Sequence, residues 1–307
     1  MAGRKNRVEA KRGWPAFCLA ALLALVASVA HSQTADDLYR QGRFADAAAA
    51  YRQQFTEDPR SADALAGLGR SLLALRRPGE AAAVLVRALQ MRPSEDAWKQ
   101  ALARAYLDAG NGAAAQDIID ALFAAAPHDP EVLFLLGESM YRSGFYERAA
   151  QSLQEALALH PDRPAARSFY AVALAKSGHL SEAEAACKAI LANRDAPPDL
   201  DVLLTYVQIL DEARRLPEAR PYAEEAVRRQ PDNPIARYWE ARLLFEAGQL
   251  DSAAKEAEQS VALSPDLPFA RNLLIQIYRT MGREQDALRQ AEWLRDYNNR
   301  QATRGAR

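Results

Sequence analysis

Alanine recurs at a fixed interval of 34 residues along most of this chain, and this spacing restricts the fold more than any other feature. The interval widens once by two residues, around Pro198 and Asp199, and then resumes. A period of roughly 20–50 residues is typical of solenoids, in which each repeat packs on its neighbours. The chain is therefore expected to form a tandem array of repeats. The alanines are Ala47, Ala81, Ala115, Ala149, Ala183, Ala219, Ala253 and Ala287.

Other residue types recur in the same register and predict two helices in each repeat. Apolar side chains at repeat positions 4, 7 and 11 share one face of a first helix, as Leu133, Leu136 and Met140 illustrate. Glycine at position 8, as in Gly69 and Gly137, lets two helices approach closely. A later glycine ends the first helix, and a proline stops the second. These residues are Gly42, Gly110, Gly144, Gly178, Gly248 and Gly282, with Pro59, Pro93, Pro127, Pro161, Pro231 and Pro265.

Three segments carry a resemblance to the tetratricopeptide repeat family. QGRFADAAAAY at 41–51 and SGFYERAAQSL at 143–153 are similar to its turn and second helix, and LFLLGESMYRSG at 133–144 is similar to its first helix. The resemblance implies an all-α, right-handed superhelical solenoid of about eight antiparallel helix pairs. The repeats span residues 28–61, 62–95, 96–129, 130–163, 164–199, 200–233, 234–267 and 268–299, and together they give a solenoid over 33–299 with a flexible basic tail at 300–307.

The first repeat is expected to lack its leading half, because residues 1–32 have the features of a secretory signal. Five basic residues precede Trp14, an apolar run extends from Pro15 to Ala30, and small residues at Ala30 and Ser32 suit a signal peptidase. The mature chain is expected in the periplasm, with secretion or an uncleaved inner-membrane anchor as alternatives. The run is shorter than the ~20 residues that span a bilayer comfortably. The first mature helix is expected to begin at Thr34.

Cys18 opens the apolar run, whereas the cysteine of a lipoprotein would follow it, so a lipid anchor is not expected. Charge also limits the partners. The chain has 39 basic and 40 acidic residues, and without residues 1–32 it keeps 34 basic and 39 acidic ones. A mildly acidic body argues against nucleic acid as the main partner, because phosphate binding needs a basic face.

The resemblance further implies an inner groove that binds extended peptides, lined by repeat positions 2, 5, 9 and 12. Aromatic and arginine side chains at these positions suit peptide recognition through stacking and forked hydrogen bonds. Several of these rings could instead pack on neighbouring repeats. Ala66 and Arg70 stand where related proteins that clamp a C-terminal carboxylate have Lys and Asn, so that partner class is not predicted. The candidate groove residues are Arg104, Phe134, Glu138, Tyr141, Tyr238, Arg242, Phe245, Phe269, Asn272 and Arg279.

The C-terminal edge of the array is expected to be uncovered. A helix over 285–297 carries Leu288, Trp293 and Tyr297, and no further helix is expected to cap it. Exposed apolar side chains at a terminal repeat indicate a partner or self-association. The alternative is that Trp293 packs back on its own repeat.

No pattern of catalytic or metal-binding residues occurs in the sequence. His31, His128, His160 and His179 lack the spacing of metal ligands, and Cys187 occupies a position expected to be a buried core thiol. Because the repeats occupy nearly the whole chain, we expect neither an enzyme nor a cofactor site.

The resulting hypothesis is a protein- or peptide-binding scaffold of the cell envelope, serving an exopolysaccharide-export, pilus or cell-wall assembly. The alternative is a periplasmic chaperone-like holder of exported polypeptides. Membrane contact is expected only through an uncleaved N-terminal segment.

Overall fold

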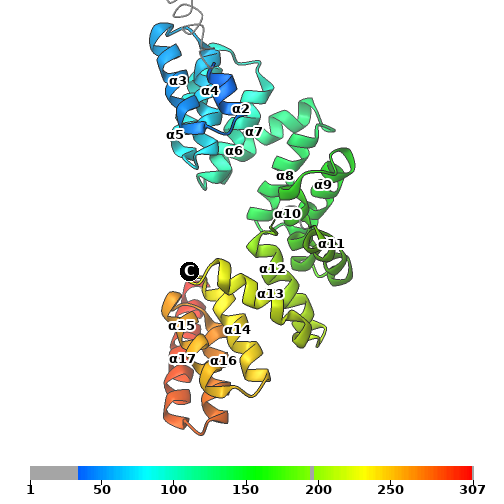
Figure 1. Ribbon diagram of the computed structural model, residues 1–307, viewed down its shortest axis with the longest axis vertical. Helices are drawn as coiled ribbons and strands as arrows, with labels where there is room; N and C mark the ends of the chain where they lie inside the picture. Colours follow the sequence, from blue (N-terminus) through cyan, green and yellow to red (C-terminus); the bar gives the residue numbers. More distant parts are fainter. Residues whose placement is uncertain (1–33, 194–196, 306–307) are drawn as a thin grey trace, which may run out of the picture. The chain divides into compact units, whose positions relative to one another are not determined.

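The computed structural model describes residues 34–193 and 197–305, and this part of the chain is helical without strands (Figure 1). The expected signal segment lies outside the described residues. Contacts divide the chain into two compact units, unit 1 at residues 1–111 and unit 2 at residues 112–307. Within the described ranges, no helix is long and apolar enough to cross a bilayer.

Unit 1 consists of successive helices that each pack on the next one along the chain, while α2 also contacts α4 and α4 contacts α6. Its first helix begins after Thr34, as predicted. The Thr34 hydroxyl accepts a hydrogen bond from the Asp37 N–H at 3.1 Å, and the Asp37 carboxylate accepts one from the Thr34 N–H at 3.2 Å. This reciprocal pair satisfies two N–H groups that have no partner within the helix. The helices are α2 (Ala35–Arg40), α3 (Phe44–Glu57), α4 (Ala62–Ala74), α5 (Pro78–Met91) and α6 (Asp96–Asp108).

Unit 2 is built from the same kind of repeat, in which a first helix packs against a second helix. Its first helices α8, α10, α12, α14 and α16 contact one another in succession, and each also packs on the second helix that follows it. These five helices begin at residues 130, 164, 200, 234 and 268, where the sequence repeats begin. The helices are α7 (Gly112–Ala125), α8 (Pro130–Arg142), α9 (Tyr146–Leu159), α10 (Pro164–Lys176), α11 (Leu180–Ala192), α12 (Leu200–Glu212), α13 (Leu216–Arg229), α14 (Pro234–Glu246), α15 (Leu250–Leu263), α16 (Pro268–Thr280) and α17 (Glu284–Gly305).

Small residues sit where helices meet. The recurring alanines are buried, with exposed fractions of 0–2%. A Cβ added to Gly69 would lie 2.5 Å from Cγ of Leu85, and one added to Gly137 would lie 2.6 Å from Cγ of Leu153. Both distances are shorter than van der Waals contact, so the predicted close approach at position 8 is confirmed.

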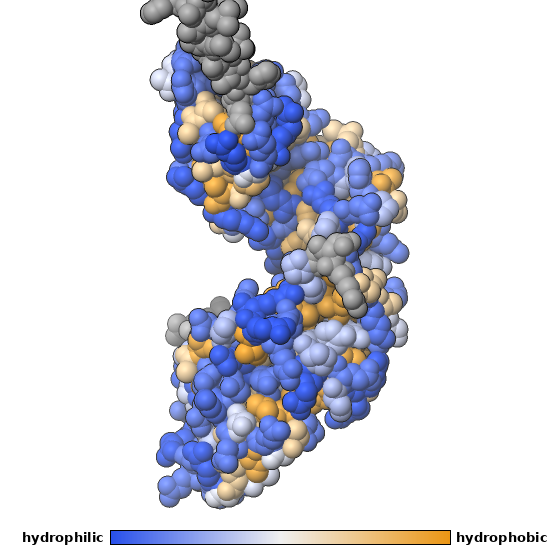
Figure 2. Space-filling model, viewed as in Figure 1, coloured by the Kyte–Doolittle hydropathy of each residue, from blue (hydrophilic) through white to orange (hydrophobic). Residues whose placement is uncertain are grey.

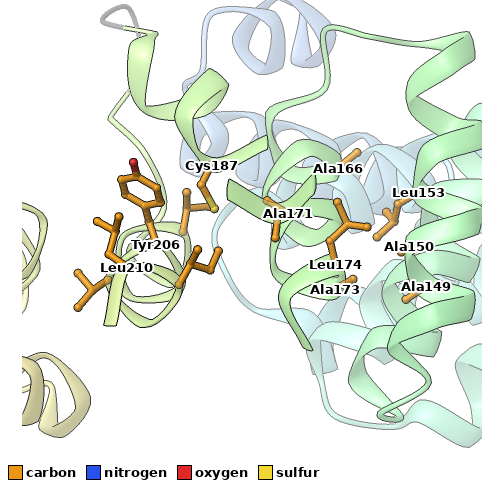
Figure 3. Packing of buried hydrophobic residues seen from close by; sticks show 14 of the residues in the cluster. Ala149, Ala150, Leu153, Ala166, Ala171, Ala173, Leu174, Cys187, Tyr206 and Leu210 are labelled. Atoms are coloured by element: carbon orange, nitrogen blue, oxygen red, sulfur yellow. The ribbon is translucent and has the colours of Figure 1, made fainter. Parts of the chain in front are cut away.

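The core of unit 2 gathers side chains from α9, α10, α11 and α12, among them Leu153, Leu174 and Cys187 (Figure 3). Cys187 is fully buried, as predicted, and burial raises the pKa of its thiol to about 12. A thiol that stays protonated is a packing group and a poor nucleophile.

The turn between the two helices of a repeat needs a positive φ. The six glycines named above all adopt it, with φ between 71° and 89°. Arg76 and Arg214 occupy the same turn position in two other repeats, with φ of 58° and 60°. Left-handed backbone costs an ordinary residue roughly 1 kcal/mol, so these two turns are strained relative to the others.

The last helix is longer than expected. We expect from the sequence a helix that ends near Tyr297, but α17 continues to Gly305. The expected end is wrong because no proline or glycine interrupts residues 284–304, so the backbone can remain helical until the first glycine.

Candidate binding surface

The first helices of unit 2 form one continuous surface, because α8, α10, α12, α14 and α16 touch in succession. We call this surface the first-helix face. Helices hold side chains on such a face in fixed register, which suits a binding surface better than mobile loops do. In the view of Figure 2, unit 2 is mostly hydrophilic and carries small, separate apolar areas.

A cavity of about 420 Å³, here the Tyr141 pocket, lies on this face. The Tyr141 and Phe169 rings meet edge to face, with centroids 5.2 Å apart. Burial raises the pKa of the Tyr141 phenol, and the nearby charge of Asp201 raises it further. The tyrosine therefore remains neutral at physiological pH. The pocket is lined by Tyr141, Ala165, Ser168, Phe169, Val172, Asp199, Leu200, Asp201, Gln230 and Asn233.

A second cluster lies further along the same face. The Arg242 guanidinium donates from Nε and Nη2 to Oδ1 of Asp211, at 3.1 and 3.0 Å. The Tyr238 and Phe269 rings meet edge to face at 4.7 Å. A cavity of about 300 Å³ adjoins the ion pair and is lined by Asp211, Arg214, Leu216, Pro217, Arg220, Arg242, Leu243, Glu246 and Ala247. The charged side chains that line this second cavity largely compensate one another.

The structure corrects two of the predicted groove residues. Phe134 and Glu138 expose 2% and 1% of their surface, so neither faces a ligand in this chain. The Arg163 guanidinium lies 3.8 Å above the Phe134 ring, and Glu138 accepts a hydrogen bond from Nε of Arg142 at 2.9 Å. These positions are buried because α7, α9 and α10 all pack on α8.

The remaining predicted groove residues differ in the helix that carries them and in how exposed they are. Arg104 lies on α6 of unit 1, whereas the other predicted groove residues belong to helices of unit 2. Phe245 on α14 is half-buried. Asn272 and Arg279 are exposed on α16. The structure therefore brings together Tyr238, Arg242 and Phe269.

Sequence reasoning missed Phe169, Asp199 and Asp201 as members of the Tyr141 pocket. Asp201 occupies repeat position 2, so the pattern of groove positions could have found it. Phe169 stands at position 6, outside that pattern, and Asp199 precedes its helix as the N-cap residue. Those two residues become neighbours of Tyr141 only when successive repeats pack together.

At the C-terminal edge, Leu288 is 57% exposed, while Trp293 is half-buried. The Arg271 guanidinium of α16 lies 3.9 Å from the Trp293 ring centroid. The Tyr297 ring stacks on the Trp293 ring, with the two ring centroids 5.0 Å apart. The structure therefore agrees with the second interpretation of the sequence, in which Trp293 packs back on its own repeat.

The helix pairs and the face they build define an all-α repeat solenoid. Two sequence profiles described as tetratricopeptide repeat match it, one at residues 33–96 and 207–268 and the other at residues 72–138 and 140–205. The chain belongs to the tetratricopeptide repeat family. Such repeats bind protein partners and are generally non-catalytic, so the chain is a protein-interaction scaffold.

Solved structures share this fold at low sequence identity. The APC/C hetero-tetramer Cut9–Hcn1 matches with 14% identity and a TM-score of 0.68, over 79% of this chain and 48% of that one, so this chain spans about half its length. PilF of Pseudomonas aeruginosa matches with 23% identity and a TM-score of 0.59, over 70% and 97% of the two chains. PilW, a type IV pilus biogenesis factor, matches with 20% identity and a TM-score of 0.56, over 66% and 93%. A comparison with curated proteins finds no match.

Proposed function

We propose that this chain is a non-catalytic scaffold of the bacterial cell envelope, which holds partner proteins of an assembly or export machine. The observation that carries the proposal is the first-helix face of unit 2, where half-buried aromatic rings, exposed carboxylates and a cavity of about 420 Å³ lie on rigid helices. Aromatic anchors beside polar groups are typical of surfaces that bind protein segments.

The envelope setting rests on the N-terminal segment of the sequence. A basic stretch, an apolar run and the small residues Ala30 and Ser32 support export and cleavage before Gln33. PilW, whose fold this chain shares, is a type IV pilus biogenesis factor, so a type IV pilus is one example of the proposed kind of assembly. An exopolysaccharide-export or cell-wall complex fits the same scaffold role.

The test is capture of partners by the tagged full chain, expressed in a Gram-negative host. Mass spectrometry of the recovered protein would identify its first residue, which we expect to be Gln33 after cleavage. Cross-linking and capture should recover one or two partners in stoichiometric amounts. A heterogeneous mixture of exported polypeptides would contradict the scaffold and favour the chaperone-like holder.

Two phenylalanines provide a matched pair of variants for this capture. Phe269 lies on the first-helix face and is 38% exposed, and Phe123 lies on the second helix α7 and is 37% exposed. Phe269→Arg should lose the partners, whereas Phe123→Arg should keep them. Equal recovery with both variants would show that the partners bind elsewhere.

A further inference from the structure

Building on the proposed function, we infer that the Tyr141 pocket receives an arginine side chain from the bound partner protein. The pocket combines two carboxylates, a hydroxyl and two aromatic rings around a cavity of about 420 Å³. Protein pockets for small groups measure roughly 300–1,000 Å³, so the space suits a side chain with its adjoining backbone.

The charge of the pocket is uncompensated. Asp199 and Asp201 line it and are both exposed, and neither forms an ion pair among the described residues. No lysine, arginine or histidine of the described part of the chain lines the pocket. The second cavity on this face differs, because Arg242 already pairs with Asp211 there. The Tyr141 pocket therefore attracts a cation that the described residues do not supply.

A largely buried serine whose hydroxyl is unpartnered among the described residues provides an independent indication of a ligand. Ser168 lines the pocket with only 8% of its surface exposed, and within the described residues its hydroxyl has no hydrogen-bond partner. Other buried serines of this chain are satisfied: Ser71 donates to the Gly67 carbonyl at 2.9 Å, and Ser260 to the Pro234 carbonyl at 2.6 Å. The Ser168 hydroxyl is therefore available to accept a donor from a ligand.

The aromatic rings favour a guanidinium over an ammonium group. Tyr141 and Phe169 form an aromatic wall of the pocket, and guanidinium groups stack on such rings. Elsewhere the chain uses this contact itself, with Arg163 over Phe134 and Arg271 over Trp293. A planar guanidinium has five donors in a fixed fork, which match in number and kind the acceptors of two carboxylates and a hydroxyl.

The test uses the full chain and fluorescent peptides in an anisotropy titration. One probe is a short Ala/Ser peptide with a single central arginine, and matched probes carry citrulline or lysine at that place. We expect the arginine peptide to bind at least about tenfold more tightly than the citrulline peptide. Added salt should weaken the binding of the arginine peptide more than that of the citrulline peptide. Equal affinities for arginine and citrulline would overturn the inference.

Charge-removing variants locate the site. The double variant Asp199→Asn, Asp201→Asn should lower the affinity for the arginine peptide about tenfold. Ser168→Ala should lower it about threefold. Asp251→Asn is the matched control, because Asp251 is exposed in the first turn of α15 and does not line the pocket. Circular dichroism would verify that all variants fold. Unchanged affinity in the double variant would place the binding of arginine elsewhere and contradict the inference.

The outcomes separate this inference from the proposed scaffold role. If partners are captured equally by the wild-type chain and by the Asp199→Asn, Asp201→Asn variant, the scaffold stands and the arginine pocket fails. If the arginine peptide binds in the pocket but the capture yields no stoichiometric partner, the pocket stands and the scaffold fails.

Discussion

Arg214 has a φ of 60° at the turn position that Gly248 occupies with a φ of 73° in the next repeat. The two residues perform the same geometric task, but only glycine does so without a clash of its Cβ atom. The structure thus contains two strained turns, at Arg214 and at Arg76.

Replacing Arg76 by glycine should therefore stabilise the protein. Arg76 is exposed, so little packing is lost, and we expect the free energy of unfolding to rise by about 0.5–1 kcal/mol. Gly248→Ala should lower it by a similar amount, because it introduces the same strain. Urea unfolding measures both. A loss of stability in Arg76→Gly would mean that strain at this turn is not significant.

The close approach of α4 and α5 can be tested with two glycines of unit 1. Gly69→Ala would place a Cβ against Leu85, so we expect a loss of about 1–3 kcal/mol. Gly79 lies in the first turn of α5 with open space around it, so Gly79→Ala should be neutral or stabilising by up to about 1 kcal/mol. Equal effects in urea unfolding would indicate that propensity, and not packing, controls both sites.

Glu240 on α14 should make the stability of unit 2 depend on pH. Its Oε2 atom is buried without a hydrogen-bond partner among the described residues. Burial raises the pKa of the carboxyl above its ordinary 4.5, Glu224 and Glu256 raise it further, and Arg220 and Arg237 oppose them. Because the fold disfavours the ionised form, a penalty absent below pH 4.5 develops as the pH rises through the folded-state pKa.

Glu240→Gln should consequently stabilise the protein at pH 7 and have little effect at pH 4. Urea unfolding at the two pH values measures the difference. Exposed Glu284 on α17 provides the control, since Glu284→Gln removes the same charge without relieving a buried carboxyl. A gain for Glu240→Gln that is equal at both pH values would argue against ionisation as the cause.

The C-terminal edge offers a contrast between a packed and an exposed side chain. Trp293 packs beneath Arg271, so Trp293→Ala should lower the free energy of unfolding by about 1–3 kcal/mol. Leu288 is 57% exposed, so Leu288→Ser should change it by less than about 0.5 kcal/mol. Thermal unfolding of both variants tests this. Light scattering on the same samples would also reveal any self-association through Leu288, as a drop in mass in Leu288→Ser.

Much of the fold could be predicted from the sequence, because the constraints on each helix pair are local and recur along the chain. Alanine at the helix contact, glycine at the turn and proline after the second helix each act within a few residues of their own position. The cap at Thr34 and the burial of Cys187 follow from the same local reasoning and are confirmed. The end of α17 was missed, because a helix without a breaking residue has no local signal for its end.

The binding surface was only partly predictable. The sequence by itself determined that this chain is a stack of helix pairs and which positions of each pair must be small. Only the tertiary structure decided which side chains remain accessible. Phe134 is buried because three helices cover α8, and Tyr141, Ser168 and Asp201 share one pocket because successive repeats bring them together. Periodicity within a helix reports which face a residue occupies, but accessibility depends on how neighbouring helices cover that face.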